Sequence, residues 1–122
     1  MSTRLSWQAP KPRTILIVDD DDSIRATLKT LLEAEGFDVV AEAGAGSEAV
    51  ELVRLRRPGV VVLDWKLPYM AGDTAARFIR QISPTAKIVA FSAFLETKPE
   101  WADAYIHKDR IDDLPELIQT LA

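Results

Sequence analysis

The sequence predicts an α/β domain built on a parallel β-sheet. Short apolar runs rich in β-branched residues alternate along the chain with segments whose apolar residues recur at helical spacing. Several of these runs end on a polar residue that is able to do chemistry. Strict alternation of strand and helix is typical of a parallel sheet with helices on both faces, which places its functional groups at the carboxyl ends of the strands.

The composition fits one such domain. The chain has 122 residues, 48% of them hydrophobic, which suffices for one core. A net charge of -4 and a pI near 5.0 argue against a nucleic-acid partner. The absence of cysteine excludes disulfides and thiolate metal sites. Since no stretch resembles a signal peptide or a membrane span, we expect a cytoplasmic protein without membrane contact.

The elements follow from the apolar pattern. Residues 1–13 have two prolines and no period, so we expect a flexible tail, with Trp7 loose rather than docked on the domain or on a partner. Five apolar runs predict strands, at 14–18, 37–41, 60–63, 87–91 and 104–107. Helix starts are predicted at the N-cap residues Ser23, Ser47 and Asp73, and near Pro115 in the last helix.

Polar side chains follow four of the five predicted strands. They are Asp19 and Asp20, Asp64, Ser92, and Lys108. Taken singly, each has a plain structural interpretation as a turn former, a helix-start acid or an exposed lysine, and for Asp21 and Asp22 we prefer that interpretation. Taken together they predict one crevice, because the carboxyl ends of parallel strands share one edge of the sheet.

The chemistry of this set points to phosphoryl transfer. Clustered carboxylates repel one another and need a cation, and oxygen ligands without His or Cys suit Mg²⁺. A carboxylate such as Asp64 can attack phosphorus to form an acyl phosphate. Lys108 and Mg²⁺ would neutralise the charge on the transferred group, and the Ser92 hydroxyl would donate to one of its oxygens.

Four motifs, in this order, resemble the receiver domain of two-component response regulators, the family of the chemotaxis regulator CheY. They are Ile17–Asp20, Val62–Gly72, Phe91–Ala93 and Tyr105–Asp109. The match covers about residues 14–122. It implies a flavodoxin-like fold with five parallel strands in the order 2-1-3-4-5.

The resemblance also implies a metal site. Asp64 would be the phosphorylated aspartate, Asp20 a direct Mg²⁺ ligand, and Asp19 a ligand acting partly through water. The main-chain carbonyl of Lys66 would be a third protein ligand. We expect the Lys66 ammonium to pair with Asp64 or Asp20 when metal is absent, and so to weaken Mg²⁺ binding.

A switch and its partners are implied as well. Ser92 and Tyr105 match the switch residues of the family, and Lys108 matches the lysine that contacts the phosphoryl group. Phosphorylation adds about -1.5 to -2 charge at one point, Ser92 moves toward it, and Tyr105 enters the vacated space. The phosphodonor would be a sensor histidine kinase or a histidine phosphotransfer protein. The output would be contact with an unknown protein target or onward passage of the phosphoryl group.

The segment 93–103 departs from the family. It must hold everything between the last two strands, yet a mean helix alone takes about 11–12 residues. It lacks a clear period, and Pro99 restricts where a helix can begin. We therefore expect the family's fourth helix to be shortened or replaced by a loop, with Phe94 and Trp101 covering the core rather than forming a new binding patch.

Two other functions compete with the phosphoacceptor interpretation. A phosphoaspartyl phosphatase would need a second acid two residues after the nucleophile, where this chain has Lys66. A receiver-like interaction module that works without phosphorylation is the alternative that the unusual 93–103 segment keeps open. We expect a signalling phosphoacceptor rather than an enzyme, with His107 an exposed strand residue and Trp65 partly exposed beside the acceptor.

Overall fold

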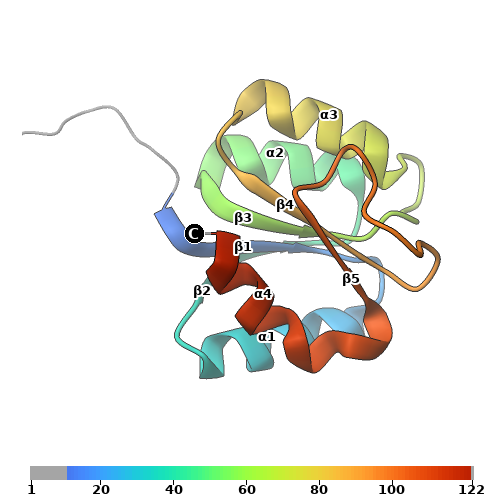
Figure 1. The fold of residues 1–122 in the computed structure, drawn as a ribbon. Coiled ribbons are helices and arrows are strands. Elements are labelled where there is room, and N and C mark those ends of the chain that lie inside the picture. Colours follow the sequence, from blue (N-terminus) through green and yellow to red (C-terminus); the bar gives the residue numbers. More distant parts are fainter. Residues whose placement is uncertain (1–10, 122) are drawn as a thin grey trace, which may run out of the picture.

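The computed structural model describes residues 11–121 and consists of one sheet covered by helices (Figure 1). The strands are β1 Lys11–Val18, β2 Asp38–Ala43, β3 Pro58–Leu63, β4 Lys87–Ser92 and β5 Ala104–His107. The α-helices are α1 Asp22–Ala34, α2 Gly46–Arg56, α3 Gly72–Ile82 and α4 Leu114–Leu121, with a 3-10 helix at Lys108–Asp113. The predicted tail spans residues 1–13. Residues 1–10, including Trp7, lie outside the described residues, whereas residues 11–13 belong to β1 rather than to a tail.

All five strands are parallel and lie in the order β2-β1-β3-β4-β5. Figure 1 shows α2 and α3 on one face of the sheet and α1 and α4 on the other. The predicted flavodoxin-like order 2-1-3-4-5 is therefore confirmed. None of the helices within residues 11–121 is both long enough and apolar enough to span a bilayer.

The central strand β3 carries the core. Its residues are buried throughout, because the sheet is covered on both faces. Val60 and Val62 face the core under α1 and α4, and Val61 and Leu63 face the core under α2 and α3. Each fully buried side chain of this kind stabilises the fold by about 1.5–3 kcal/mol, so the end of β3 is a rigid platform for Asp64.

The helix starts differ from the predicted N-caps. Asp21, not Ser23, caps α1, since its Oδ1 accepts hydrogen bonds from the amides of Ser23 and Ile24 at 2.8 and 3.2 Å. The helices α2 and α3 begin at glycines, slightly before the predicted starts, and neither has a side-chain N-cap bond. At α2 the Gly44 amide donates to the Glu48 carboxylate at 2.9 Å, which ties the loop before the helix to its first turn.

Residues 93–103, all described, form an ordered loop without a helix, as predicted. Asp103 anchors its far end to the sheet. The Asp103 amide donates to the Ile88 carbonyl at 2.8 Å, and the Asp103 carboxylate accepts from the Ile88 amide at 2.8 Å and from Arg80 at 3.0 Å. Arg80 also donates to the Trp101 carbonyl at 3.1 Å, so α3 holds this half of the loop.

The two aromatic residues of the loop behave differently. Trp101 is half-buried and packs against the core under α2 and α3, as predicted. Phe94 is 61% exposed, so the prediction that it covers the core is wrong. Its ring instead lies under the Lys66 ammonium, 4.6 Å from Nζ to the ring centroid.

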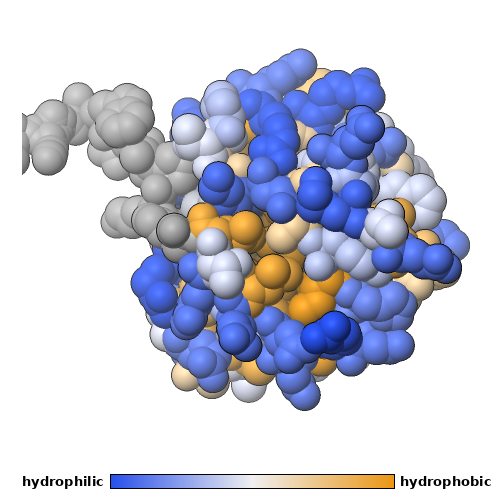
Figure 2. All heavy atoms as spheres, in the orientation of Figure 1, coloured by the Kyte–Doolittle hydropathy of each residue, from blue (hydrophilic) through white to orange (hydrophobic). Residues whose placement is uncertain are grey.

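A hydrophobic surface lies between β5 and α4. Figure 2 shows it as an orange area between β5 and α4, ringed by hydrophilic residues. The groove there is lined by Ile106 and Leu117 together with Tyr105, His107, Arg110 and Asp113.

We predict that replacing Asp103 with Ala lowers the free energy of unfolding by about 1–2 kcal/mol, because the Ile88 amide loses its acceptor. Burial by itself raises the pKa of Asp103, but the bonds from the Ile88 amide and Arg80 outweigh it and lower the pKa overall. The stability that the carboxylate contributes is thus present near neutral pH and lost as the pH falls through that lowered pKa. Urea unfolding at several pH values measures both effects.

The matched control is Glu96→Ala, an exposed acid in the same loop. It should leave the unfolding free energy within about 0.5 kcal/mol of the wild-type value. Equal losses in the two variants would show that Asp103 does not anchor the loop.

Candidate functional site

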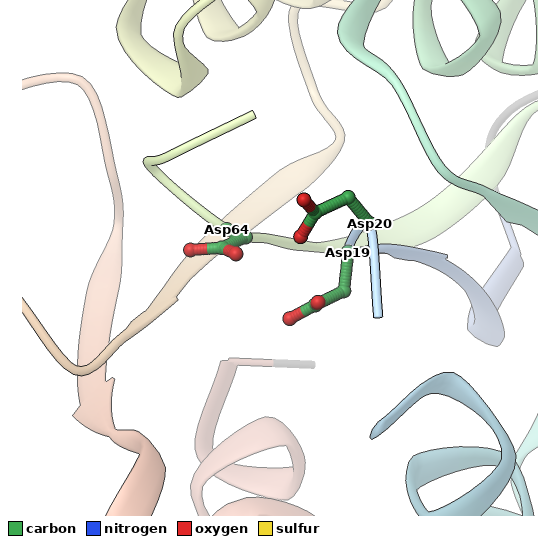
Figure 3. Close-up of side chains that lie close together, drawn as sticks. All are labelled: Asp19, Asp20 and Asp64. Atoms are coloured by element: carbon green, nitrogen blue, oxygen red, sulfur yellow. The ribbon is translucent and has the colours of Figure 1, made fainter. Parts of the chain in front are cut away.

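Three carboxylates meet at the carboxyl ends of β1 and β3 (Figure 3). Asp19 and Asp20 follow β1, and Asp64 follows the neighbouring β3. One carboxylate oxygen from each lies within 4.8 Å of the others. Asp19 and Asp64 are buried, at 0% and 3% exposure, whereas Asp20 is exposed, so the cluster opens to solvent on one side.

Lys108 brings one positive charge to this cluster. Its Nζ lies 2.7 Å from Asp19 Oδ2 and 3.2 Å from Asp64 Oδ2. Although the ammonium is close, Asp19 Oδ2 accepts no well-oriented hydrogen bond, and it is buried. The charge contact alone compensates that oxygen, while Asp19 Oδ1 accepts from the Asp21 amide at 2.9 Å.

The crowding is visible in the pKa values. Burial, and then the neighbouring charge of Asp19, raise the pKa of Asp64 above its ordinary value, although Lys108 and the Lys66 amide act in the opposite direction. Burial disfavours the charged form of Lys108, but Asp19 and Asp64 outweigh this and raise its pKa. Two carboxylates are thus buried together, and the charged form of Asp64 is disfavoured as a result. Shifted pKa values of this kind are typical of functional sites.

The loop after Asp64 wraps tightly around it. The Lys66 amide donates to Asp64 Oδ1 at 3.3 Å, and the Gly72 amide donates to the Trp65 carbonyl at 2.7 Å. A Cβ on Gly72 would lie 2.6 Å from the Asp64 carbonyl oxygen, so only glycine permits this approach. Tyr69, at φ 65°, adopts the left-handed conformation that non-glycine residues rarely take.

The Lys66 side chain turns away from the acids. Its ammonium lies over the Phe94 ring, and the ammonium that pairs with Asp64 is that of Lys108. The predicted ion pair of Lys66 with Asp64 or Asp20 is therefore wrong, and the expected competition with Mg²⁺ loses its basis. A cation on an aromatic face gains about 0.5–1 kcal/mol at exposed sites, which favours the observed rotamer.

The two predicted switch residues lie beside the cluster rather than in it. Ser92 is fully buried, and its Oγ accepts a hydrogen bond from the Phe94 amide at 2.9 Å. Tyr105 is half-buried, and its hydroxyl donates to the Leu95 carbonyl. Both side chains hold the start of the 93–103 loop in this conformation.

The two remaining aromatic predictions fit the structure. Trp65 is partly exposed next to Asp64. His107 is partly exposed on β5, and its Nδ1 accepts from the Asp109 amide at 3.0 Å, which caps the following 3-10 helix.

An open cleft of about 380 Å³ leads to the three carboxylates. Lys108, Lys66 and Phe94 line it with the acids, and Ile24, Leu67 and Pro68 form an apolar rim. This rim was not predicted, because its members come from separate loops and helix starts.

The donor set fits a magnesium ion. It offers carboxylate oxygens from three residues, one of them accessible to solvent, and it contains a buried oxygen that lacks a well-oriented hydrogen bond. Mg²⁺ binds through one or two carboxylates and retains several waters, so an open, all-oxygen site suits it.

Comparison with known proteins agrees with this geometry. Residues 15–119 match the family model of the response regulator receiver domain. The chain belongs to this family. Receiver domains are signalling modules of two-component systems, and the strand ends that carry the motifs here are the ones that meet in the structure.

Individual relatives cover much of the chain. The transcriptional regulatory protein PdtaR of Mycobacterium tuberculosis is 43% identical over 86 residues, which are 69% of this chain but 42% of PdtaR. The chemotaxis protein CheY of Bacillus subtilis is 44% identical over 79 residues, 65% of this chain and 66% of CheY. The match therefore spans less than half the length of PdtaR.

A solved structure is similar over most of both chains. In the crystal structure of the CheX-CheY-BeF3-Mg²⁺ complex from Borrelia burgdorferi, the matched chain superposes with a TM-score of 0.77 at 26% identity. The match covers 89% of this chain and 89% of that one.

We predict that Asp64→Asn stabilises the fold in the absence of divalent cations. The amide removes a buried charge, still accepts from the Lys66 amide, and leaves Lys108 paired with Asp19. The midpoint of thermal unfolding near neutral pH should rise by about 2–5 °C. Because the raised pKa makes the native wild type bind a proton more readily than the unfolded chain, the gap between the two proteins should narrow as the pH falls toward that pKa.

The control is Asp112→Asn, which neutralises an exposed acid after β5 and should leave the midpoint nearly unchanged. An Asp64→Asn protein less stable than the wild type at neutral pH would refute the proposed crowding.

Proposed function

We propose that the chain is a phosphoacceptor switch that takes a phosphoryl group onto Asp64. The observation that carries this is the placement of the Asp64 carboxylate, buried at the floor of an open cleft between the acids of β1 and the Lys108 ammonium. A nucleophile, a cation site and a fixed positive charge thus surround one point that a phosphoryl group can reach.

The reaction balances with a phosphohistidine donor. A carboxylate oxygen of Asp64 forms a bond to phosphorus as the bond from phosphorus to the histidine nitrogen breaks. The electron pair of that bond stays on the imidazole, which takes up a proton from water. The product is an acyl phosphate on Asp64, and the donor would be a sensor histidine kinase or a histidine phosphotransfer protein.

A bound Mg²⁺ would supply charge neutralisation for the phosphoryl oxygens. Asp20, Asp19 and Asp64 would hold it through their carboxylates, and the main-chain carbonyl of Lys66 would add a protein oxygen. The occurrence of Mg²⁺ in the Borrelia CheY complex supports this choice of metal. The exposed position of Asp20 suits a ligand that binds the ion directly from solvent.

Lys108 would pair with the phosphoryl group once Asp64 carries it. It now bridges Asp19 and Asp64, and a phosphoryl group on Asp64 would offer its Nζ a more highly charged partner at a similar distance. Its raised pKa keeps it protonated near neutral pH, so it can stabilise the developing negative charge.

Ser92 and Tyr105 would transmit the change. When the Ser92 hydroxyl turns to a phosphoryl oxygen it releases the Phe94 amide, and when Tyr105 reorients it releases the Leu95 carbonyl. The start of the 93–103 loop would then rearrange, as a population shift between two packings. The output would be contact with a protein target or onward passage of the phosphoryl group.

The competing function is a receiver-like interaction module that works without phosphorylation. The loop that replaces a helix between β4 and β5 favours it, since that surface departs from the family. The complete set of acids with Lys108 favours the phosphoacceptor. A phosphatase is disfavoured because Lys66 stands where the second acid would be.

The deciding experiment is an intact mass measurement after incubation with acetyl phosphate and MgCl₂. We expect one added phosphoryl group on the wild type, none with EDTA, and none on Asp64→Asn, because the amide is not a nucleophile. Lys108→Ala should accept the group at least about tenfold more slowly.

Asp112→Asn is again the matched control, since it removes an exposed carboxylate and should be phosphorylated like the wild type. An adduct that persists in Asp64→Asn, or no adduct on the wild type under any of these conditions, would favour the phosphorylation-independent module.

A further inference from the structure

Arg25 occupies a position that helix electrostatics disfavour. It lies in the first turn of α1, at the positive end of the helix dipole, where anions rather than cations are stabilising. Its side chain is nevertheless only 17% exposed. The contacts of its side chain must therefore offset this unfavourable position.

Its guanidinium joins three elements at the edge of the cleft. Nη1 donates to the Asp19 main-chain carbonyl at 2.6 Å, Nη2 pairs with Asp22, and Nε lies 3.5 Å from Glu42 Oε1. One planar guanidinium thus links the end of β1, the start of α1 and the neighbouring strand β2. A lysine ammonium, which is a single point charge, cannot reproduce that geometry.

The carbonyl that Arg25 holds belongs to the peptide between the two acids of β1. That peptide is planar, so fixing its oxygen fixes the direction in which the backbone enters Asp20. Asp20 is exposed, and packing does little to orient it. Asp19 is fixed by the bond of its amide to the Ala43 carbonyl at 3.0 Å, and the Asp20–Asp21 peptide is fixed by the bond of the Asp21 amide to Asp19 Oδ1 at 2.9 Å. Arg25 holds the other peptide that flanks Asp20, and the two together set its orientation.

The charge of Arg25 is largely balanced where it lies. Asp22 and Glu42 face it from α1 and β2, and Lys29 shares Glu42 at 3.9 Å. A bare cation this close to a metal site would repel Mg²⁺, whereas a cation paired with two carboxylates repels it far less.

We propose that Arg25 is a positioning residue for the divalent cation, acting through the Asp19–Asp20 peptide. This rests on the proposed function, because it concerns the same metal site. Two effects of Arg25 on metal affinity have opposite directions. Removing a positive charge near a cation site should tighten metal binding, whereas losing the hydrogen bond from Arg25 to the Asp19 carbonyl should weaken it.

The test uses Arg25→Met and Lys29→Met, which remove one positive charge each from the same helix and the same Glu42 partner. Only Arg25 contacts the Asp19 carbonyl. Each protein is titrated with MgCl₂ by tryptophan fluorescence, which Trp65 beside the site should report, at a temperature where circular dichroism shows all variants folded.

We expect Lys29→Met to bind Mg²⁺ as tightly as the wild type or slightly more tightly. Arg25→Met should bind about tenfold more weakly, in the range found when groups that orient metal ligands are removed. The rate of phosphorylation by acetyl phosphate should recover at saturating MgCl₂, because the defect lies in metal affinity. A merely structural role would lower the melting temperature without moving the half-saturating MgCl₂ concentration.

Arg25→Met binding as tightly as Lys29→Met would overturn the inference. Should Arg25→Met fail to fold, Arg25→Lys is judged by the same criterion, since it keeps the charge and loses the fork. A wild-type chain that shows no response to MgCl₂ would overturn the metal site and the proposed function together, whereas equal affinities in all variants would overturn only the role of Arg25.

Discussion

The contact of Lys108 with Asp19 and Asp64 is the interaction on which the site depends. Parallel pairing of β1 with β3 forces two buried carboxylates together, and a single ammonium from the end of β5 compensates them. Since like charges in a buried site repel strongly, this arrangement stores unfavourable free energy that a cation or a charged ligand can relieve. Sheet topology therefore creates the chemistry, because it brings the ends of β1, β3 and β5 to one place.

Much of this could be predicted from the sequence, for a physical reason. Buried strands are recognisable as apolar runs, and parallel strands share an edge, so the order of residues along the chain sufficed to group Asp19, Asp20, Asp64 and Lys108. What failed depended on local side-chain choices. Asp21 rather than Ser23 caps α1, and the Lys66 ammonium selects the Phe94 ring over the acids. Such alternatives differ by about 1 kcal/mol, which periodicity cannot resolve.

The importance of Arg25 could have been inferred from the sequence. A cation in the first turn of a helix contradicts the rule that helix starts favour acids, and such local conflicts concentrate where function imposes a cost. The exposed Phe94 and the left-handed Tyr69 are conflicts of the same kind, and both lie in the loops around Asp64. A further left-handed residue, Arg57, lies at the C-terminus of α2, so such conflicts are not confined to the site.

The two halves of the 93–103 loop are anchored differently, which limits how much of its surface could differ between two conformational states. Arg80 and Asp103 fix the half that includes Trp101, whereas only the first few residues are held by Ser92 and Tyr105. A standard protein interface engages about 20–30 residues on each side, far more than this short segment supplies. A partner would therefore gain most of its affinity from surface that is the same in both states. Its preference for one state would rest on a few contacts, and a shift of the equilibrium from 1:99 to 99:1 would require about 5.5 kcal/mol from them alone. Such a segment is suited to shifting the equilibrium between the two states partially rather than completely.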